Sequence, residues 1–197
     1  VTEITEDEVR EIQSATVGQN NDLWHRERQK RLNSSKFGRI CKRTDRTDPR
    51  ALARSLLVKE DIRSKSVLHG RSYELIAIQS YEVHQGIATT PCGIFISQDY
   101  PFLAATPDRI VNDNLLLEVK CPYTAREMKI SPQTVPYLHC KEGKLQLSQT
   151  HEYYYQVQGQ MLCTGALAVD FVVYTLQDMQ VIRVNKDDNF IVTMLNQ

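Results

Sequence analysis

Residues 109–120 read RIVNDNLLLEVK, and the fold class follows from this stretch. Two apolar runs flank the triplet Asn112-Asp113-Asn114, a pattern typical of a β-hairpin. In the second run Glu118 and Lys120 are two residues apart, so their side chains leave the same face of a strand. Asp108 lies at the end of the neighbouring strand. The hairpin therefore brings two carboxylates and one ammonium group together.

The rest of the chain alternates between helical and strand patterns. Thr5 and Glu8 form a capping box before a helix, and Asp48-Pro49 is typical of a helix start. We expect an α/β fold, with a mixed central sheet flanked by helices and a helical, basic N-terminal part. The expected helices cover 6–17, 34–42, 50–58, 67–84, 151–164 and a last helix capped by Asp188. The expected strands cover 93–97, 102–105, 109–111, 115–120, 168–175 and 181–184. Thr124 and Glu127 are expected to form a second capping box, and residues 129–150 are expected to form a loop.

Composition and charge narrow the class of protein. The chain has 197 residues, of which 41% are hydrophobic and 24% charged, as in ordinary globular proteins. An acidic start and the lack of a long apolar run predict no membrane segment and an intracellular protein, cytoplasmic or, in a eukaryote, nuclear. The five cysteines form no C-x-x-C pair and are expected to be free thiols.

The zero net charge hides an uneven distribution. Residues 1–23 carry −5, residues 24–65 carry +9 and residues 66–197 carry −4. A concentrated basic segment attracts a polyanion, although the same charges are also compatible with a solvated helix face. We expect an acidic helix in 1–23, which either folds onto the protein or contacts a partner, and a separate domain over 24–197.

The charged triad at the hairpin has two interpretations. Glu118 and Lys120 surround Val119 and follow three leucines, and in such an apolar setting a structural salt bridge is the simpler explanation. Two carboxylates beside a lysine also supply what a hard cation and an activated water require.

Four segments together resemble a known family. Pro107-Asp108 followed by Glu118-Val119-Lys120 is the signature of the PD-(D/E)xK nuclease superfamily. The helix segment 70–74 (GRSYE), the segment 118–124 (EVKCPYT) and the helix segment 153–158 (YYYQVQ) resemble the λ-exonuclease-like, or YqaJ viral recombinase, group. Upstream, 24–28 (WHRER) and 33–37 (NSSKF) resemble another segment of that group, although Asn33-Ser34 replace its Thr-Ala.

The resemblance implies a role for each matching residue. Asp108 and Glu118 would bind Mg²⁺, or Mn²⁺ as the alternative ion, together with the Val119 carbonyl, and Lys120 would orient or activate water. Glu74 would bind a second metal or its water, and Gln156 would stabilise the site. Arg28 and Ser35 would hold the 5′-phosphate of a DNA end, with Lys36, Arg31 and Arg39 as alternatives. The family relatives that hold an iron–sulfur cluster need four cysteines with a close C-terminal group, so no cluster is expected here.

The implied activity is 5′-to-3′ exonuclease action on duplex DNA ends, used in recombination or end resection. The implied partners are a single-strand annealing protein and further copies of the chain in a homotrimer. Two alternatives remain: a structure-specific endonuclease with the same site, and a DNA-binding module from a mobile element whose nuclease site is vestigial.

Overall fold

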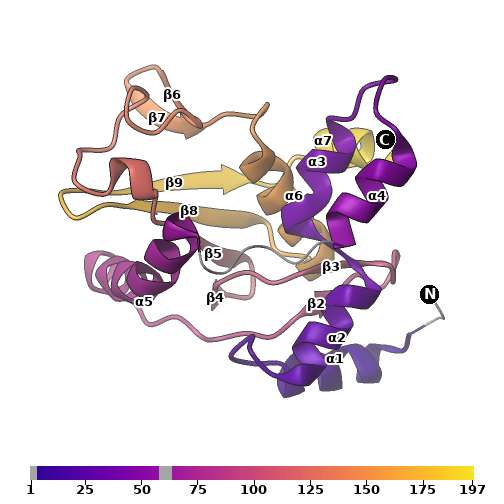
Figure 1. Ribbon diagram of the computed structural model, residues 1–197. Coiled ribbons are helices and arrows are strands. Elements are labelled where there is room, and N and C mark those ends of the chain that lie inside the picture. The colour runs from indigo at the N-terminus through magenta and orange to yellow at the C-terminus, as the bar shows by residue number, and fades with distance from the viewer. Residues whose placement is uncertain (1–3, 58–63) are drawn as a thin grey trace.

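The computed structural model of the protein describes residues 4–57 and 64–197 (Figure 1). Its centre is a mixed four-stranded sheet with the order β4-β5-β8-β9. The first two strands are the predicted hairpin, β5 and β8 are parallel, and β8 and β9 are antiparallel. The expected α/β fold with mixed strand directions is confirmed. The strands are β4 (Arg109–Asn112), β5 (Leu115–Lys120), β8 (Ala168–Tyr174) and β9 (Met179–Asn185).

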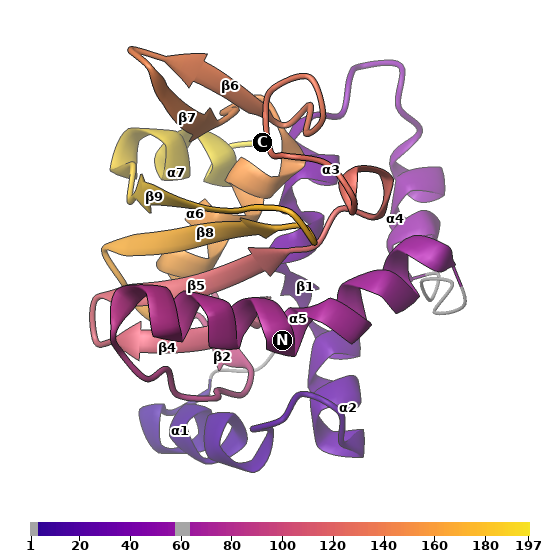
Figure 2. The ribbon, with the colours of Figure 1, turned by 90° about the vertical axis from the view of Figure 1, so that its left-hand side faces the viewer.

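Helices cover both faces of this sheet, α5 (Lys65–Gln85) on one and α6 (Glu152–Thr164) on the other (Figure 2). Leu117 and Val119 of β5 belong to the apolar cluster under α5. Leu116, whose side chain points to the opposite face of the strand, belongs to the cluster under α6. Because side chains alternate along a strand, Glu118 and Lys120 lie on the α6 side.

A second, smaller sheet connects residues 32–33 with the two strands that precede the hairpin. Its order is β1-β3-β2, and β1 is parallel to β3. The strands predicted at 93–97 and 102–105 are confirmed, but they pair here rather than in the central sheet. The first strand has two residues, and only its pairing with a segment 71 positions away identifies it. The bounds are β1 (Leu32–Asn33), β2 (Phe95–Ile96) and β3 (Leu103–Ala105).

The N-terminal part is helical, as predicted. Thr5 caps the first helix, and both hydrogen bonds of the capping box with Glu8 are present. A further helix, which the sequence analysis did not predict, has Asn21 as its N-cap and carries the start of the basic segment. The end expected at Val58 lies outside the described residues. The elements are α1 (Glu6–Ala15), α2 (Asp22–Lys30), the 3-10 helix η1 (Ser34–Lys36), α3 (Phe37–Cys41) and α4 (Pro49–Leu57).

Two predictions in the second half are wrong. Residues 129–150 contain a hairpin of β6 (Leu138–Lys141) and β7 (Lys144–Leu147), because Glu142 and Gly143 both adopt the positive φ that a tight hairpin turn requires. Thr124 does not cap a helix: Pro122 precedes the 3-10 helix η2 (Tyr123–Ala125), and no side chain caps its start.

The N-cap of the C-terminal helix α7 (Asp188–Leu195) lies one residue earlier than expected. Asp187 accepts a hydrogen bond from the Phe190 N–H and is therefore the N-cap, whereas Asp188 lies in the first turn and pairs with Lys186. In the part of the chain that the structure describes, no helix has the length and apolarity needed to cross a membrane.

Candidate active site

Glu118 is the most heavily bonded side chain of the predicted site. It is 2% exposed. Its Oε1 accepts hydrogen bonds from Lys120 Nζ at 2.5 Å and from Gln156 Nε2 at 2.6 Å. Its Oε2 accepts one from Gln160 Nε2 at 2.6 Å. A buried carboxyl group needs such donors to replace its lost hydration, so β5 and α6 together satisfy this side chain inside the protein.

Asp108 is positioned by the backbone of the same hairpin. Its N–H donates to the Leu117 carbonyl at 3.2 Å, and its Oδ2 accepts from the Val119 N–H at 2.7 Å. Both contacts are with backbone groups of β5, the strand on which period-two spacing predicted that Glu118 and Lys120 share a face. The carboxylate is therefore held beside the segment that carries Glu118 and Lys120.

Glu74 adds a third carboxylate from α5. Its side chain lies at the exposed edge of the group. Burial and the charge of Glu118 raise its pKa. Burial, Glu118 and Glu74 likewise raise the pKa of Asp108 well above its usual value. The raised pKa values of Glu74 and Asp108 show that this place favours an added positive charge.

Lys120 supplies part of that charge. Its Nζ lies 4.6 Å from the centre of the Tyr153 ring, in a cation–π contact. Burial alone would lower its pKa, but Glu118, Tyr153 and Asp108 outweigh burial and raise it. Lys120 is therefore a cation in this arrangement. This single ammonium group faces three carboxyl groups.

The donor set fits a divalent oxygen-binding cation. Carboxylate and carbonyl oxygens are the ligands that Mg²⁺ prefers, and the mutual repulsion of Asp108, Glu118 and Glu74 is relieved by a cation between them. Within residues 4–57 and 64–197 no group of three or more His, Cys, Asp or Glu side chains is arranged so that it could hold a metal ion. The carboxylate of Glu118 is turned toward Lys120 and the two glutamines instead.

Arg28 lies against the strand end that leads to Asp108. Its Nη1 donates to the Thr106 hydroxyl at 2.7 Å, and its guanidinium lies 4.5 Å from the centre of the Trp24 ring. Asn33 also approaches the Thr106 hydroxyl, at 3.5 Å. The N-terminal basic segment and the hairpin therefore meet two residues before Asp108.

Ser35 lies in η1, next to α6. Its N–H and its hydroxyl both donate to Asn33 Oδ1, at 3.3 and 3.2 Å. Asn33 is thus the N-cap of this turn. It is the first residue of the Asn33-Ser34 pair that differs from the Thr-Ala of the family segment. The basic alternatives have other contacts: Arg31 pairs with buried Glu27, Lys36 donates to the Leu56 carbonyl, and Arg39 donates to the Ser55 hydroxyl.

Sequence reasoning missed three residues that support the site. Gln160 lies one helical turn after Gln156, and this spacing of four residues on one helix face is the signal that could have revealed it. Thr106 directly precedes the Pro107-Asp108 motif, and this position is the signal that could have revealed it. Gln19, in the N-terminal segment, donates to the Pro107 carbonyl at 2.7 Å, and no pattern in the sequence indicates this contact.

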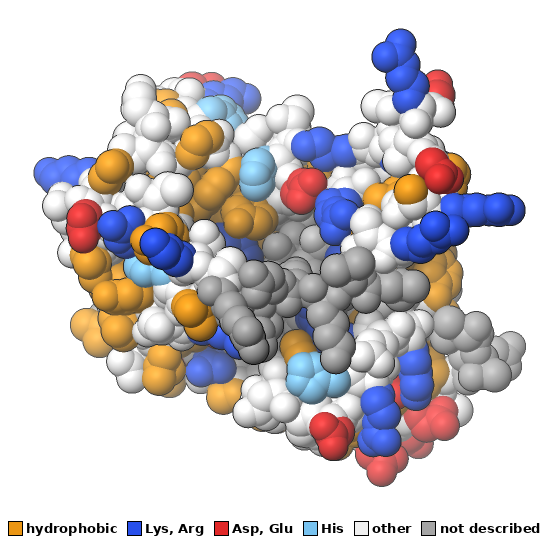
Figure 3. Space-filling model, viewed as in Figure 1, with side chains coloured by type: hydrophobic (Ala, Val, Ile, Leu, Met, Phe, Trp, Pro, Cys, Tyr) orange, Lys and Arg blue, Asp and Glu red, His pale blue; other side chains and the backbone are white. Residues whose placement is uncertain are grey.

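The surface around the site is basic on one side. Figure 2 shows β5 running toward the face that Figure 3 presents, and this face is hollowed near its centre. Lys and Arg side chains gather beside the hollow, over α3 and α4. The exposed cations of this part of the chain are Arg39, Lys42, Arg43, Arg46, Arg50 and Arg54.

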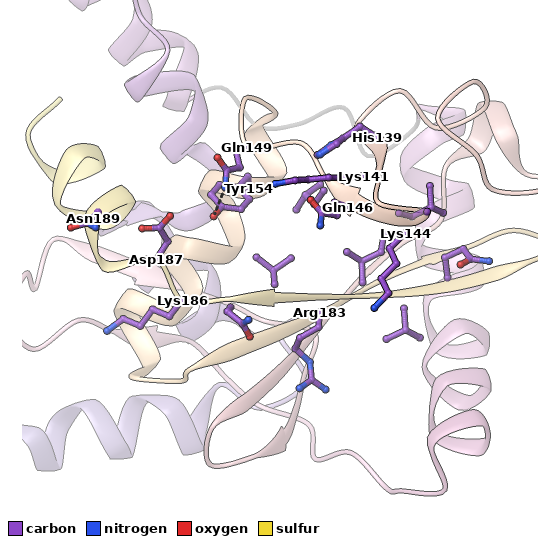
Figure 4. A pocket seen from close by; sticks show the side chains of 18 of the residues that line it. His139, Lys141, Lys144, Gln146, Gln149, Tyr154, Arg183, Lys186, Asp187 and Asn189 are labelled. Carbon is purple, nitrogen blue, oxygen red and sulfur yellow. Dashed lines mark hydrogen bonds between the residues drawn. The ribbon is translucent and has the colours of Figure 1, made fainter.

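A separate groove of about 1210 Å³ lies between the β6–β7 hairpin, β9 and the start of α7 (Figure 4). Lys141 and Lys144 extend from the hairpin, and Arg183 and Lys186 from the β9 side. None of the eight side chains or carbonyl groups predicted for the site lines this groove. It is therefore a different surface from the carboxylate cluster.

Several solved structures are similar to this fold, and exonucleases are among them by their titles. An alkaline exonuclease from Laribacter hongkongensis is similar with a TM-score of 0.70 and 23% identity, over 89% of this chain and 88% of that chain. The same enzyme in complex with dAMP gives a TM-score of 0.69 at 25% identity, over the same shares of both chains. A phage-related exonuclease from Haemophilus somnus gives 0.59 at 14% identity, over 84% of this chain and 88% of that chain. The expected restriction-endonuclease-like fold is confirmed.

A comparison with curated proteins found no significant match. The model of the YqaJ-like viral recombinase domain matches residues 23–167, which is most of the chain. That range contains the hairpin with Asp108, Glu118 and Lys120, the helix with Gln156, and the basic segment with Arg28. The resemblance seen in the sequence is thereby confirmed, and the chain belongs to the YqaJ-like viral recombinase family.

Proposed function

We propose that the protein is a Mg²⁺-dependent deoxyribonuclease that degrades duplex DNA from its ends in the 5′-to-3′ direction, for recombination or end resection. One observation carries the proposal: adjacent strands place Asp108, Glu118 and Lys120 together, and α6 adds Gln156 to Glu118. Family membership and the exonuclease titles of the similar structures support the reaction class.

The residues around the hairpin would hold the metal. Asp108 and Glu118 would be side-chain ligands and the Val119 carbonyl a further one, while Glu74 would reach a second ion or its water. Mn²⁺ has the same ligand preference and is the alternative ion. A bound divalent ion supplies an activated water and neutralises the charge that develops on the phosphodiester oxygens.

Lys120, Gln156 and Glu74 then have separate tasks. The ammonium group of Lys120 orients the attacking water and stabilises negative charge near the scissile phosphate, because its raised pKa keeps it protonated. Gln156 holds the carboxylate of Glu118 by its 2.6 Å hydrogen bond, so that the carboxylate keeps one orientation. Glu74 is exposed on α5, from where it would bind the second ion or its water.

We assign the 5′-phosphate of the DNA end to Arg28 and Ser35. The bond from Arg28 to Thr106 supports this assignment, because it places a guanidinium two residues from Asp108. Arginine is well suited to bind a terminal phosphate through paired hydrogen bonds. From the family resemblance we extend the proposal to a homotrimer that acts with a single-strand annealing protein, inside the cell, where its DNA substrate is.

Cleavage of defined DNA substrates tests the proposal. A linear duplex with a 5′-phosphate, the same duplex with a 5′-hydroxyl, and a closed circular duplex are incubated with Mg²⁺, with Mn²⁺ or with EDTA. We expect degradation of the phosphorylated linear duplex from the 5′ end, loss of activity in EDTA, and a loss of at least about a thousandfold in Asp108→Asn and Lys120→Met.

Matched variants at exposed positions control for the chemical change. Asp113→Asn lies in the turn of the same hairpin, and Lys129→Met lies on an exposed segment, so both should retain wild-type rates. Cutting of the closed circle would instead identify an endonuclease with the same site. DNA binding without cleavage under either metal would identify a vestigial binding module and overturn the proposal.

A further inference from the structure

We propose that Gln19 is a positioning residue for the carboxylate of Asp108. Gln19 lies in the N-terminal segment, before the part of the chain that matches the family domain. The inference rests on the proposed function, because it assigns Asp108 to the catalytic site. The N-terminal segment is then a working part of the active site rather than a separate appendage.

Gln19 holds the peptide group that leads into Asp108. Its Nε2 donates to the Pro107 carbonyl at 2.7 Å and to the Cys92 carbonyl at 3.2 Å. The thiol of Cys92 donates to the same Pro107 carbonyl at 3.2 Å. One side-chain amide therefore connects the segment before β2 with the residue that precedes the catalytic carboxylate.

The same peptide group is anchored on its other side. The N–H of Asp108 donates to Leu117 at 3.2 Å, and Oδ2 of Asp108 accepts from Val119 at 2.7 Å. A peptide group is planar, so bonds at its carbonyl and at its N–H together fix its orientation. Gln19 supplies the shorter bond on the carbonyl side, and the direction of the carboxylate depends on that bond.

The N-terminal helix is seated firmly enough to hold Gln19 in place. Thr16 is fully buried, and its hydroxyl accepts a hydrogen bond from the Ile94 N–H at 2.9 Å. A Cβ atom at Gly93 would lie 2.0 Å from the Gln13 carbonyl oxygen, so only glycine permits this close approach. The end of α1 is thus packed onto the segment that enters β2.

The backbone of Gln19 is itself in an unusual conformation. Its φ is +53°, in the left-handed region that favours glycine. A glutamine at such a position costs backbone strain that the neighbouring contacts must offset, which points to a use for its side chain. The side-chain bonds to Pro107 and Cys92 are that use.

This conformation makes a sharp test possible. Gln19→Gly removes the amide and at the same time relieves the backbone, so the relieved strain offsets the loss of two hydrogen bonds and folding stability should stay nearly unchanged while the anchor is lost. Asn20→Gly, at an exposed position in the same turn, is the matched control, since it adds similar flexibility without touching Pro107. Gln19→Glu keeps the shape but directs a carboxylate at two carbonyl oxygens, and should be at least as harmful as Gln19→Gly.

Two readouts decide the question. The first is backbone amide hydrogen exchange over residues 106–119 in the protein without DNA, which we expect to become faster in Gln19→Gly and to stay unchanged in Asn20→Gly. The second is the Mg²⁺ dependence of cleavage: the rate at saturating metal should fall by about 10–100-fold and the half-saturating Mg²⁺ concentration should rise, with an unchanged melting temperature.

The two proposals can fail separately. If the wild-type protein does not cleave DNA but exchange still accelerates in Gln19→Gly, the proposed function fails while the anchoring of Asp108 by Gln19 stands. If the wild type cleaves DNA, and Gln19→Gly shows wild-type exchange and a wild-type Mg²⁺ dependence, the assignment of Gln19 is overturned.

Discussion

At the scale of single residues, Glu118 shows how a charge is kept inside this protein. Each of its carboxylate oxygens has a donor, and the two glutamines that provide neutral donors come from one face of α6. Neutral amide donors hold a carboxylate without cancelling its charge, so Glu118 keeps its attraction for a cation. An additional lysine at the position of Gln160 would compete with the metal.

The role of Gln160 can be tested by Gln160→Leu. The substitution removes the donor to Glu118 Oε2, and we expect a loss of about 10–100-fold in cleavage rate. The Oε1 of Gln160 is buried without a hydrogen-bond partner among the described residues, and leucine removes this unpaired acceptor too. The free energy of unfolding should therefore change by only about 1–2 kcal/mol. Steady-state cleavage and urea denaturation measure both effects, with Gln146→Leu on exposed β7 as the control.

The carboxylates predict a pH dependence of metal binding. Burial, Glu118 and Glu74 raise the pKa of Asp108, and burial and Glu118 raise that of Glu74. Lys120 opposes both shifts, and Arg109 opposes that of Glu74. In the unfolded chain both groups ionise at lower pH. At pH values between the pKa of these groups in the unfolded chain and their raised pKa in the folded protein, the unfolded state binds fewer protons than the folded state. The stability of the metal-free protein therefore falls as the pH rises through this range.

A bound divalent ion removes this repulsion. We therefore expect added Mg²⁺ to raise the melting temperature more at about pH 8 than at about pH 5, with a stabilisation of roughly 1–3 kcal/mol at the higher pH. Thermal melts with Mg²⁺ and with EDTA measure the difference. Asp108→Asn should reduce it, and an equal gain at both pH values would contradict the metal assignment.

At the scale of elements, α6 joins the two halves of the site. It carries Gln156 and Gln160 toward β5, and its Gly159 packs against η1 and α3. A Cβ at Gly159 would lie 2.6 Å from the Phe37 ring and 3.0 Å from the Ser34 side chain. The small residue in the middle of the helix therefore lets η1, with Ser35, approach the helix that carries Gln156 and Gln160.

Two glycine-to-alanine changes in helices should have opposite effects. Gly159→Ala should lower the free energy of unfolding by about 1–3 kcal/mol, because the added methyl group overlaps Phe37. Gly70→Ala should raise it by about 0.5–1 kcal/mol, because α5 has open space at that position and alanine is the better helix former. Chemical denaturation of both variants measures the pair. Equal effects would show that α6 does not pack closely against Phe37.

The elements also show what the sequence could reveal. The Thr5 capping box, the hairpin at 112–114 and the face shared by Glu118 and Lys120 depend on local spacing, and all three were predicted correctly. The β6–β7 hairpin was missed because its short strands mix lysine, glutamine and histidine with leucine and do not alternate clearly. Strand β1 and the contact of Gln19 depend on partners about 70 to 90 positions away, which local patterns do not encode.

At the scale of the whole molecule, charge is separated along the chain and across the surface. The +9 segment 24–65 supplies cations beside the hollow face, whereas the buried site is acidic. A polyanion is attracted to the first and repelled by the second until a divalent ion binds. We expect DNA binding to depend strongly on salt concentration, and cleavage to depend on metal.

Arg28 connects these two regions and can be tested through the DNA end. In Arg28→Ala the ratio of cleavage rates for 5′-phosphorylated and 5′-hydroxyl duplexes should move toward one, because a phosphate contact is lost. The slope of log affinity against log salt should become shallower by about 0.9. Arg26→Ala, at an exposed position of the same helix, should keep the end preference. A wild-type ratio in Arg28→Ala would place the terminal phosphate elsewhere.

The long-range contacts of the site set the order in which a newly made chain can become active. Gln19 is made before Pro107, and Glu118 is made before Gln156 and Gln160, so each must wait for a partner that follows it in the chain. The carboxylate cluster therefore closes only when α6 has emerged. Until then we expect the nascent chain to be inactive, so the proposed activity is withheld until the stretch from Gln19 to Gln160 has been made.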